Sequence, residues 1–536
     1  MRRGCLHLWP VDAAEDAQSG PTPYTHIILT SFRAIREQRL SDEVGTLFKQ
    51  AALPVALVYP SPYHVGMSSL GFQTIYRELH ALPDVTAERA FLPDDVPAAK
   101  QSREALCTYE SNRPVSDFPI VAFSLAYELE LAGLVDCLDM SGIPALAADR
   151  AHDPHRHPLV LVGGPLTFSN PVPAGPFADV MIMGEAEDLI GVLVGHVLAE
   201  RDRSTLLAKL AVIPGFYVPS IHGEMAPSVA KVPNERLPAH SQIRTPHTEL
   251  SNMLLIEPER GCHRECTYCV MRRSTNGGMR LVSPEKVLSL IPDDVKRVGL
   301  VGAAVTDHPK LPEILSALVA KGHGIGISSL RADRLTDEIV GLLKAGGYRT
   351  LTTASDGSSE RMRIAIARKT NERHLLAAAE LTRKHGLRLL KLYMMLGLPG
   401  ETMDDIDELI RFAKELAKIA PKVAFGIAPF VAKRNTPLDQ HPFEDTAVIE
   451  ERLTRLRDGV KGKVDIRSTS ARWAWVEYRL AQGGFAAGMA AAEAARAGGA
   501  FGVWKKALAK VPLPHVLHTP AVAPAKLRVL ATAQQL

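Results

Sequence analysis

Short apolar segments alternate with segments of helical spacing over residues 51–200. Four apolar segments read as strands: Pro54–Tyr59, Phe118–Phe123, Leu159–Val162 and Ala178–Met183. Between them, Met67–His80 and Glu128–Met140 have helical spacing. Strands that alternate with helices form parallel sheets, because each crossover helix returns the chain to the same edge. We therefore expect an α/β fold with a doubly wound, Rossmann-like domain over residues 51–200.

A second series of six strand-and-helix units follows over residues 251–440. The expected strands are Met253–Ile256, Val298–Val301, Ile325–Ser328, Thr350–Thr353, Leu389–Met395 and Ala424–Pro429. Six such units predict a partial (β/α)6 barrel. In parallel barrels, functional residues lie on the loops that follow the carboxyl ends of the strands.

The remaining segments carry weaker patterns. Residues 1–50 read as a polar lead-in that ends in a helix from Ser41, and residues 201–250, which contain prolines and no clear period, read as a linker. Residues 441–536 are expected to form a helical C-terminal region, with helices over 446–461, 470–482 and 485–510. A helix with Arg472, Trp473 and Trp475 either forms a lid or packs internally.

Composition and charge exclude several classes of protein. The 62 basic and 59 acidic residues give a net charge of +3, which does not favour a nucleic-acid partner. No run of eighteen apolar residues predicts a membrane span, and no signal peptide is visible, so we expect a cytoplasmic protein.

Three of the six cysteines lie within eight residues, at Cys262, Cys266 and Cys269. Thiolates at this spacing suit an iron–sulfur cluster, and three ligands for a 4Fe–4S cluster leave one iron open. The alternatives are a zinc site that includes His263, a ferredoxin-type cluster with a distant fourth cysteine, and chance clustering. His263 directly follows Cys262, which is an awkward geometry for shared chelation of zinc.

The pattern Cys-x-x-x-Cys-x-aromatic-Cys after the first strand of a six-unit series resembles the radical S-adenosylmethionine (radical SAM) superfamily. The resemblance implies an enzyme in which a 4Fe–4S cluster on these cysteines reductively cleaves S-adenosylmethionine. It also implies a flavodoxin- or ferredoxin-type electron donor. Tyr268 would then lie near the adenine.

The resemblance also indicates which strand ends bind S-adenosylmethionine. The small residues that begin at Gly302 correspond to a Gly-Gly-Glu-like stretch of the superfamily, although the glutamate is absent here. With Tyr268, the expected binding residues are Gly302, Ser328, Ser329, Arg331, Asp356, Gly397, Pro399 and Glu401. For each, the alternative is an ordinary loop residue, and Glu401 would then support the helix that begins near Thr402. Lys391 and Tyr393 are two residues apart on one expected strand, so they share a face. They either face the barrel cavity or pack against other side chains.

A doubly wound domain ahead of such a barrel is similar to the cobalamin-binding domain of one branch of the superfamily, which is largely uncharacterised. Small residues at strand ends leave room for a macrocycle. The candidate cobalamin residues are His64, Ser124, Leu125, Gly163, Gly164, Gly184 and Glu185. The Asp-x-His-x-x-Gly motif that supplies a cobalt ligand is absent, because Pro62 and Met67 stand at its Asp and Gly positions.

Three reactions remain open at this point. Cobalamin-dependent methyl transfer to an unactivated carbon fits the two-domain order. A corrin-free cyclisation, rearrangement or oxidation is the alternative if the first domain keeps only the fold. A methylthiotransferase-like activity would need a second cluster, for which Cys5, Cys107 and Cys137 are a poor fit. The catalytic residues and the substrate, a small molecule or a peptide, are not identified by the sequence.

Overall fold

The computed structural model of the protein describes residues 31–271, 278–328 and 330–512. Its first sheet has the order β2-β1-β3-β4-β5-β6 and is parallel except for the β5–β6 pair. The strands are β1 (Leu53–Tyr59), β2 (Val85–Phe91), β3 (Ile120–Ser124), β4 (Leu159–Gly163), β5 (Val180–Ile182) and β6 (Phe216–Tyr217). Almost every residue of β1 is buried, as expected for a parallel strand that helices cover on both faces.

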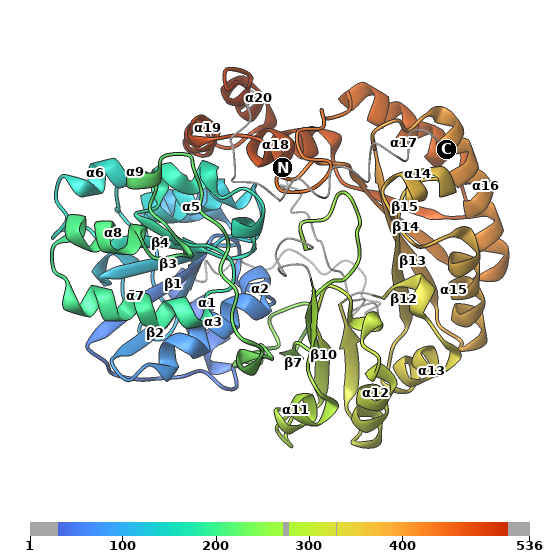
Figure 1. Ribbon diagram of the computed structural model, residues 1–536, viewed down its shortest axis with the longest axis horizontal. Helices are drawn as coiled ribbons and strands as arrows, with labels where there is room; N and C mark the ends of the chain where they lie inside the picture. The colour runs from blue at the N-terminus through green and yellow to red at the C-terminus, as the bar shows by residue number, and fades with distance from the viewer. Residues whose placement is uncertain (1–30, 272–277, 329, 513–536) are drawn as a thin grey trace, which may run out of the picture.

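The described residues of this first part form nine α-helices. Figure 1 shows them around the blue and green sheet. They are α1 (Phe32–Ser41), α2 (Tyr63–Gly66), α3 (Leu70–Ala81), α4 (Val96–Ser102), α5 (Glu130–Met140), α6 (Ala147–Ala151), α7 (Glu187–Ala199), α8 (Arg203–Ala211) and α9 (Pro219–His222).

The structure differs from the expectation at both ends of this part. The helix expected from Ser41 is wrong, because α1 ends at that residue. The reason is local: Ser31 caps the helix by accepting from the Ala34 N–H, so the helix begins earlier. The expected linker over 201–250 begins with α8 and β6, and β6 pairs with β5, so the first sheet continues past residue 200.

The second part contains two parallel sheets, β11-β10-β7 and β12-β13-β14-β15, which one bridge between Leu330 and Thr353 joins. The six predicted strands all form, and β15 extends the second sheet beyond them. A short antiparallel pair, β8–β9, stands apart. The bounds are β7 (Met253–Ile256), β8 (Glu259–Gly261), β9 (Met279–Leu281), β10 (Arg297–Leu300), β11 (Gly324–Ile327), β12 (Thr350–Asp356), β13 (Leu389–Leu396), β14 (Val423–Pro429) and β15 (Asp465–Ser468).

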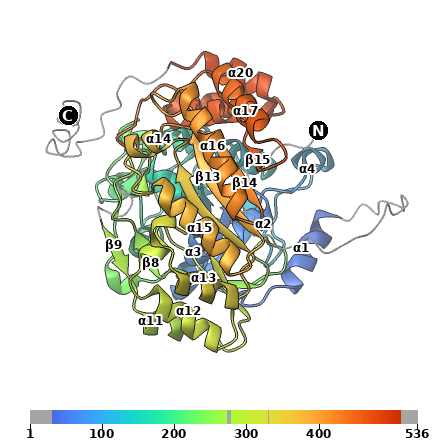
Figure 2. The ribbon, with the colours of Figure 1, turned by 90° about the vertical axis from the view of Figure 1, so that its right-hand side faces the viewer.

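Helices cover the outer face of these sheets, as the two views in Figures 1 and 2 show. The longest, α16, begins after Thr402, whose backbone N–H donates to Asp405 Oδ2 at 2.8 Å. The helices are α11 (Pro284–Ser289), α12 (Leu311–Ala320), α13 (Asp337–Ala345), α14 (Glu360–Ala365), α15 (Glu372–Lys384), α16 (Met403–Ile419), α17 (Thr446–Val460), α18 (Ala471–Ala481), α19 (Phe485–Arg496) and α20 (Phe501–Ala509).

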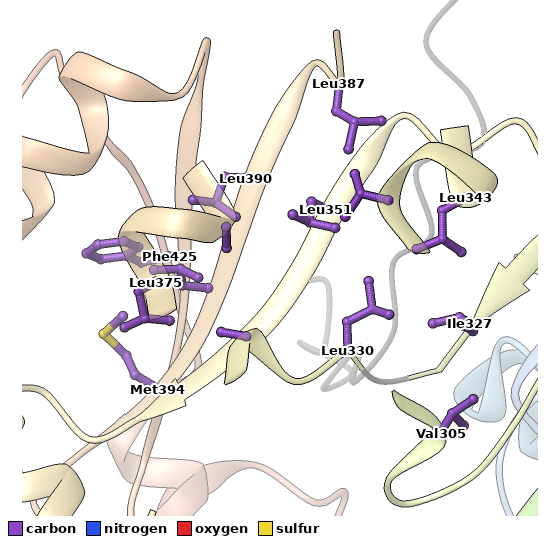
Figure 3. Packing of buried hydrophobic residues seen from close by; sticks show 14 of the residues in the cluster. Val305, Ile327, Leu330, Leu343, Leu351, Leu375, Leu387, Leu390, Met394 and Phe425 are labelled. Carbon is purple, nitrogen blue, oxygen red and sulfur yellow. The ribbon is translucent and has the colours of Figure 1, made fainter. Parts of the chain in front are cut away.

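Alternate residues of β13 face opposite sides of its sheet. Leu390 and Met394 join the buried cluster under the helices, together with Leu351 and Phe425 of the neighbouring strands (Figure 3). Lys391 and Tyr393 therefore lie on the inner face, where the Lys391 ammonium stands 5.0 Å from the centre of the Tyr393 ring.

The C-terminal helices pack on the first part of the chain. Leu480 of α18, Ala491 of α19 and Trp504 of α20 share a buried cluster with α5 and the first sheet. Trp473 contacts the rings of Phe501 and Trp504, so this tryptophan helix makes packing contacts. Within the described ranges, no helix is long and apolar enough to cross a membrane.

Candidate functional site

The three clustered cysteines lie on one loop after the β7 strand and the short β8 strand. Cys266 is buried, while Cys262 and Cys269 are half-buried, and none of the described cysteines forms a disulfide. The Arg264 N–H donates to Cys262 Sγ at 3.4 Å, and the Cys269 N–H donates to the Cys266 carbonyl at 3.3 Å. These two contacts show that the loop curls back on itself at Cys262 and again between Cys266 and Cys269.

Burial changes the acidity of these thiols. It raises the pKa of Cys262 above its usual value and that of Cys269 to about 11, and the charges of the neighbouring cysteines act in the same direction. Such thiols ionise only with a cation beside them, as in a metal cluster. Among the described residues, no three His, Cys, Asp or Glu side chains surround a position for one metal ion.

Asp307 ties the cysteine loop to the loop after β10, and the sequence analysis missed it. Its fully buried carboxylate accepts two hydrogen bonds from Arg264, each 3.0 Å long, and a third of 3.1 Å from Arg334. Burial alone would raise the pKa of Asp307, but Arg264 and Arg331 outweigh burial and lower it. A single acidic residue in a loop carries no sequence signal that would predict this role.

Gly302 and Ser328, both predicted, meet at the ends of β10 and β11. Ser328 Oγ lies 3.0 Å from both the N and the O of Gly302. A Cβ at Gly302 would collide with Glu259 Oε1, which accepts from the Ala304 N–H at 2.8 Å. Burial raises the pKa of Glu259 to about 8. Ser329 lies outside the described residues.

Arg331 is 5% exposed and follows the end of β11. Its Nη2 lies 3.3 Å from Asp333 Oδ1, yet neither Nε nor Nη2 has a hydrogen-bond partner among the described residues. Burial, together with nearby Arg368, lowers the pKa of Arg331. A buried guanidinium with free donors is suited to a carboxylate ligand.

Asp356 ends β12 with a positive φ of 63° and pairs with Arg368, whose Nε lies 2.8 Å from Asp356 Oδ2. Tyr268 lies beside this pair, and burial and the Asp356 charge raise the pKa of its hydroxyl well above the usual value. The Tyr268 side chain also packs against a small cluster that contains Leu398 and Phe430. The structure thus brings together Tyr268, Asp356 and the loop after β13.

That loop, which includes Pro399, is held by Glu401. Glu401 Oε2 accepts from the Gly397 N–H at 2.7 Å and from Arg452 at 3.1 Å, and Oε1 accepts from Ser358 at 2.5 Å. These bonds give Glu401 a structural role, and its contact with S-adenosylmethionine stays a prediction. Gly397 has a φ of 81°, a conformation that favours glycine.

Protein atoms occupy much of the room that we expected at the carboxyl edge of the first sheet. Leu125 is fully buried, and a Cβ at Gly164 would stand 2.6 Å from its carbonyl oxygen. Gly184 is covered in the same way by Ala230. By contrast, Ser124 and Gly163 are half-buried, and a Cβ at Gly163 would meet only one atom, at 3.9 Å.

Two other candidates on this edge bond to protein groups. Glu185 is buried and forms an ion pair with Arg280 of β9, and it accepts from the Val232 N–H at 2.8 Å. These contacts connect the first sheet to the base of the cysteine loop, so they assign Glu185 a structural role. His64 follows β1 and is 3.8 Å from Asp94, at a partly exposed position.

The two described cysteines of the first part, Cys107 and Cys137, do not form a second cluster site. Cys137 is fully buried in α5, and Cys107 lies on a bridge to Pro114. Cys5 lies outside the described residues.

Two family models match the chain. "Radical SAM proteins, N-terminal" matches residues 71–219, and "Radical SAM superfamily" matches residues 256–413. The second match includes the cysteine loop and Arg331.

The chain is also similar to individual proteins. An uncharacterised protein of Methanocaldococcus jannaschii is 27% identical over 397 residues, which are 73% of this chain and 80% of that one. The ribosomal protein uS12 methylthiotransferase RimO of Thermotoga sp. is 27% identical over 173 residues, and this match spans only 40% of its length.

The fold is also similar to that of a solved structure. The radical S-adenosylmethionine methyltransferase TsrM of Kitasatospora setae, solved with cobalamin and a [4Fe-4S] cluster, has a TM-score of 0.51 at 14% identity. The match covers 73% of this chain and 74% of that one.

Proposed function

The chain belongs to the radical SAM superfamily and is an enzyme, and from that premise we propose that Cys262, Cys266 and Cys269 hold a 4Fe–4S cluster at which S-adenosylmethionine is reductively cleaved. The observation that carries the proposal is the placement of these three thiols on one loop, beside the carboxyl ends of the parallel strands. When bound, the cluster supplies an open iron and the electron that splits the sulfonium into methionine and a 5′-deoxyadenosyl radical.

The surrounding residues fit an anionic cluster. Arg264, Arg331 and Arg368 come from three different loops, and all three guanidiniums lie near the cysteine loop. A cluster on three thiolates carries net negative charge, which fixed cations stabilise in a partly buried site.

S-adenosylmethionine would bind at the adjoining strand ends. The free donors of Arg331 would bind the methionine carboxylate, and the backbone beside Gly302 would bind its amine. Tyr268 and Leu398, which share one apolar cluster, would contact the adenine. Ser328, Gly397 and Pro399 would shape the surrounding cavity, and Asp356 would accept from ribose.

We further propose that the enzyme transfers a methyl group to an unactivated carbon, with cobalamin bound at the carboxyl edge of the first sheet. When bound, cobalamin supplies the methyl group. The open part of that edge, at Ser124 and Gly163, supports this proposal, and His64 lies after the neighbouring strand β1. The protein side of this cobalamin site would be formed by Gly164, Gly184 and Leu125. The fold shared with TsrM supports the same proposal.

Two alternatives remain. Corrin-free radical chemistry is favoured by the protein contacts of Gly164, Gly184 and Glu185, which narrow the cobalamin edge. Methylthiotransferase-like chemistry is favoured by the local similarity to RimO, although Cys107 and Cys137 show no second cluster site.

Anaerobic purification after expression with cobalamin tests these proposals. We expect about four iron and four sulfide per chain, and their loss in a Cys262/Cys266/Cys269→Ala variant. Bound corrin and cobalt would support methyl transfer. A full cluster without cobalt would instead favour corrin-free chemistry, and a wild-type protein without iron would contradict the cluster itself.

A further inference from the structure

The chain segment that follows α14 runs along the cysteine loop. The Thr267 N–H donates to the Ile366 carbonyl at 3.1 Å, which fixes residues 366–368 beside the segment between Cys266 and Cys269. Ala367 turns the chain with a positive φ of 54°, so the next residue, Arg368, points back toward the loop.

Three groups hold the Arg368 guanidinium in place. Its Nε lies 2.8 Å from Asp356 Oδ2, and its Nη2 donates to the Ala354 carbonyl at 3.2 Å. The Cys266 thiol also interacts electrostatically with this guanidinium. The side chain is only 9% exposed, so solvent screens its charge weakly.

We infer that Arg368 is a positioning residue that raises the reduction potential of the cluster by holding a fixed positive charge at Cys266, while Asp356 offsets part of that charge. This inference rests on the proposed function. Reduction adds one negative charge to the cluster, and a nearby cation stabilises the reduced state more than the oxidised state. Cations and hydrogen bonds next to ligand atoms are an established means of tuning metal centres.

Arg368 and Asp356 have opposite charges, so removing each charge in turn should shift the midpoint potential in opposite directions. Arg368→Gln removes the cation, so the midpoint potential should fall. Asp356→Asn removes the anion and keeps a side chain of similar size beside Arg368, so the midpoint should rise. Arg368→Lys keeps the charge and is the matched control, with a midpoint close to that of the wild type.

The measurement is a potentiometric titration of the reconstituted full-length protein without S-adenosylmethionine, followed by electron paramagnetic resonance. At a fixed potential, we expect the ratio of oxidised to reduced cluster in Arg368→Gln to exceed the wild-type ratio about tenfold, equivalent to about 59 mV for one electron. An unchanged midpoint in a cluster-loaded Arg368→Gln protein would overturn the inference.

If Arg368→Gln retains no iron, the Asp356→Asn variant decides: a higher midpoint supports the inference, and an unchanged one overturns it. A wild-type protein that binds no cluster would contradict the proposed function itself, and the inference with it. If the inference alone fails, the cluster forms normally and its midpoint potential is the same in the wild type, Arg368→Gln and Asp356→Asn.

Discussion

Lys433 Nζ lies 2.6 Å from Glu128 Oε2 and 2.7 Å from Glu477 Oε1, and so joins three separate parts of the chain. Lys433 follows β14, Glu128 follows β3 of the first sheet, and Glu477 lies on α18. The Glu128 side chain is 2% exposed. One ammonium therefore connects the carboxyl edges of both units to the C-terminal helices.

Replacing this lysine should loosen the connection. Lys433→Met leaves Glu128 buried without its cation, and we expect a loss of about 3 kcal/mol in the free energy of unfolding. Thermal unfolding followed by circular dichroism would show a lower Tm. The Lys433→Met/Glu128→Gln double variant should recover part of the loss, because no buried charge then lacks a partner. Equal stability of Lys433→Met and the wild type would contradict this role.

Arg331 should control the affinity for S-adenosylmethionine. Arg331→Gln removes a guanidinium whose Nε and Nη2 form no hydrogen bond among the described residues, although it lies in ion-pair range of Asp307 and Asp333. A charge-assisted hydrogen bond contributes about 1.5–3 kcal/mol. We expect the Kd to rise at least about tenfold, measured by equilibrium dialysis, with the iron content unchanged. Arg334→Gln is the matched control, since Arg334 also pairs with Asp307 but is half exposed. Equal weakening in both variants would argue against a direct contact.

Asp307 should hold the cysteine loop in its cluster-binding shape. Asp307→Asn weakens three guanidinium contacts at a buried position, so the loop should retain its cluster less well. Iron per chain after a standard challenge with a chelator would fall several-fold relative to the wild type. Asp333→Asn, which keeps Asp307 intact, should lose less iron. Full iron retention in Asp307→Asn would show that the loop does not need this anchor.

Glu130 should make stability depend on pH. Burial raises the pKa of Glu130 from 4.5 to about 7, although the Ala126 N–H donates to it at 2.6 Å. The folded protein therefore holds a proton there that the unfolded chain releases near pH 4.5. This contribution is fully present below pH 4.5 and is lost as the pH rises through 7, by roughly 3 kcal/mol at most.

A comparison with Glu130→Gln isolates this effect from other buried acids. The variant does not ionise, so the stability of the wild type should decline relative to that of the variant between pH 4.5 and 7.5. Chemical denaturation at several pH values measures the difference. A constant difference across this range would contradict the raised pKa.

The strands that the sequence predicted are those whose own residues are apolar. All six strands of the second series form, and most are short apolar runs whose outer face packs under helices. Strand β2 was missed because it contains Glu88 and Arg89. Arg89 is fully buried, and its charge is met by Glu43 and Glu110, which are distant in sequence. Such pairing is set by tertiary structure and leaves no local pattern.

The residues of the candidate site also fall into two groups, those predicted from local sequence and those defined by tertiary contacts. The cysteines and the small residues after each strand follow from local pattern, and the structure brings Gly302 to Ser328 and Tyr268 to Leu398. Asp307 and Arg368 act through partners that are far away in the sequence, so no spacing predicted them. Protein backbone approaches Gly164 and Gly184 closely, because a glycine allows close approach by backbone as readily as by a ligand, and no local pattern distinguishes the two. The contact of these glycines with cobalamin stays a prediction.

The most direct test of the account is the formation of 5′-deoxyadenosine by the reduced, cluster-loaded protein. Anaerobic incubation with S-adenosylmethionine and dithionite, followed by liquid chromatography and mass spectrometry, measures it. We predict 5′-deoxyadenosine and methionine from the wild type and none above background from Cys266→Ala. A cluster-loaded wild-type protein that leaves S-adenosylmethionine intact, or a Cys266→Ala variant that cleaves it equally well, would contradict the account.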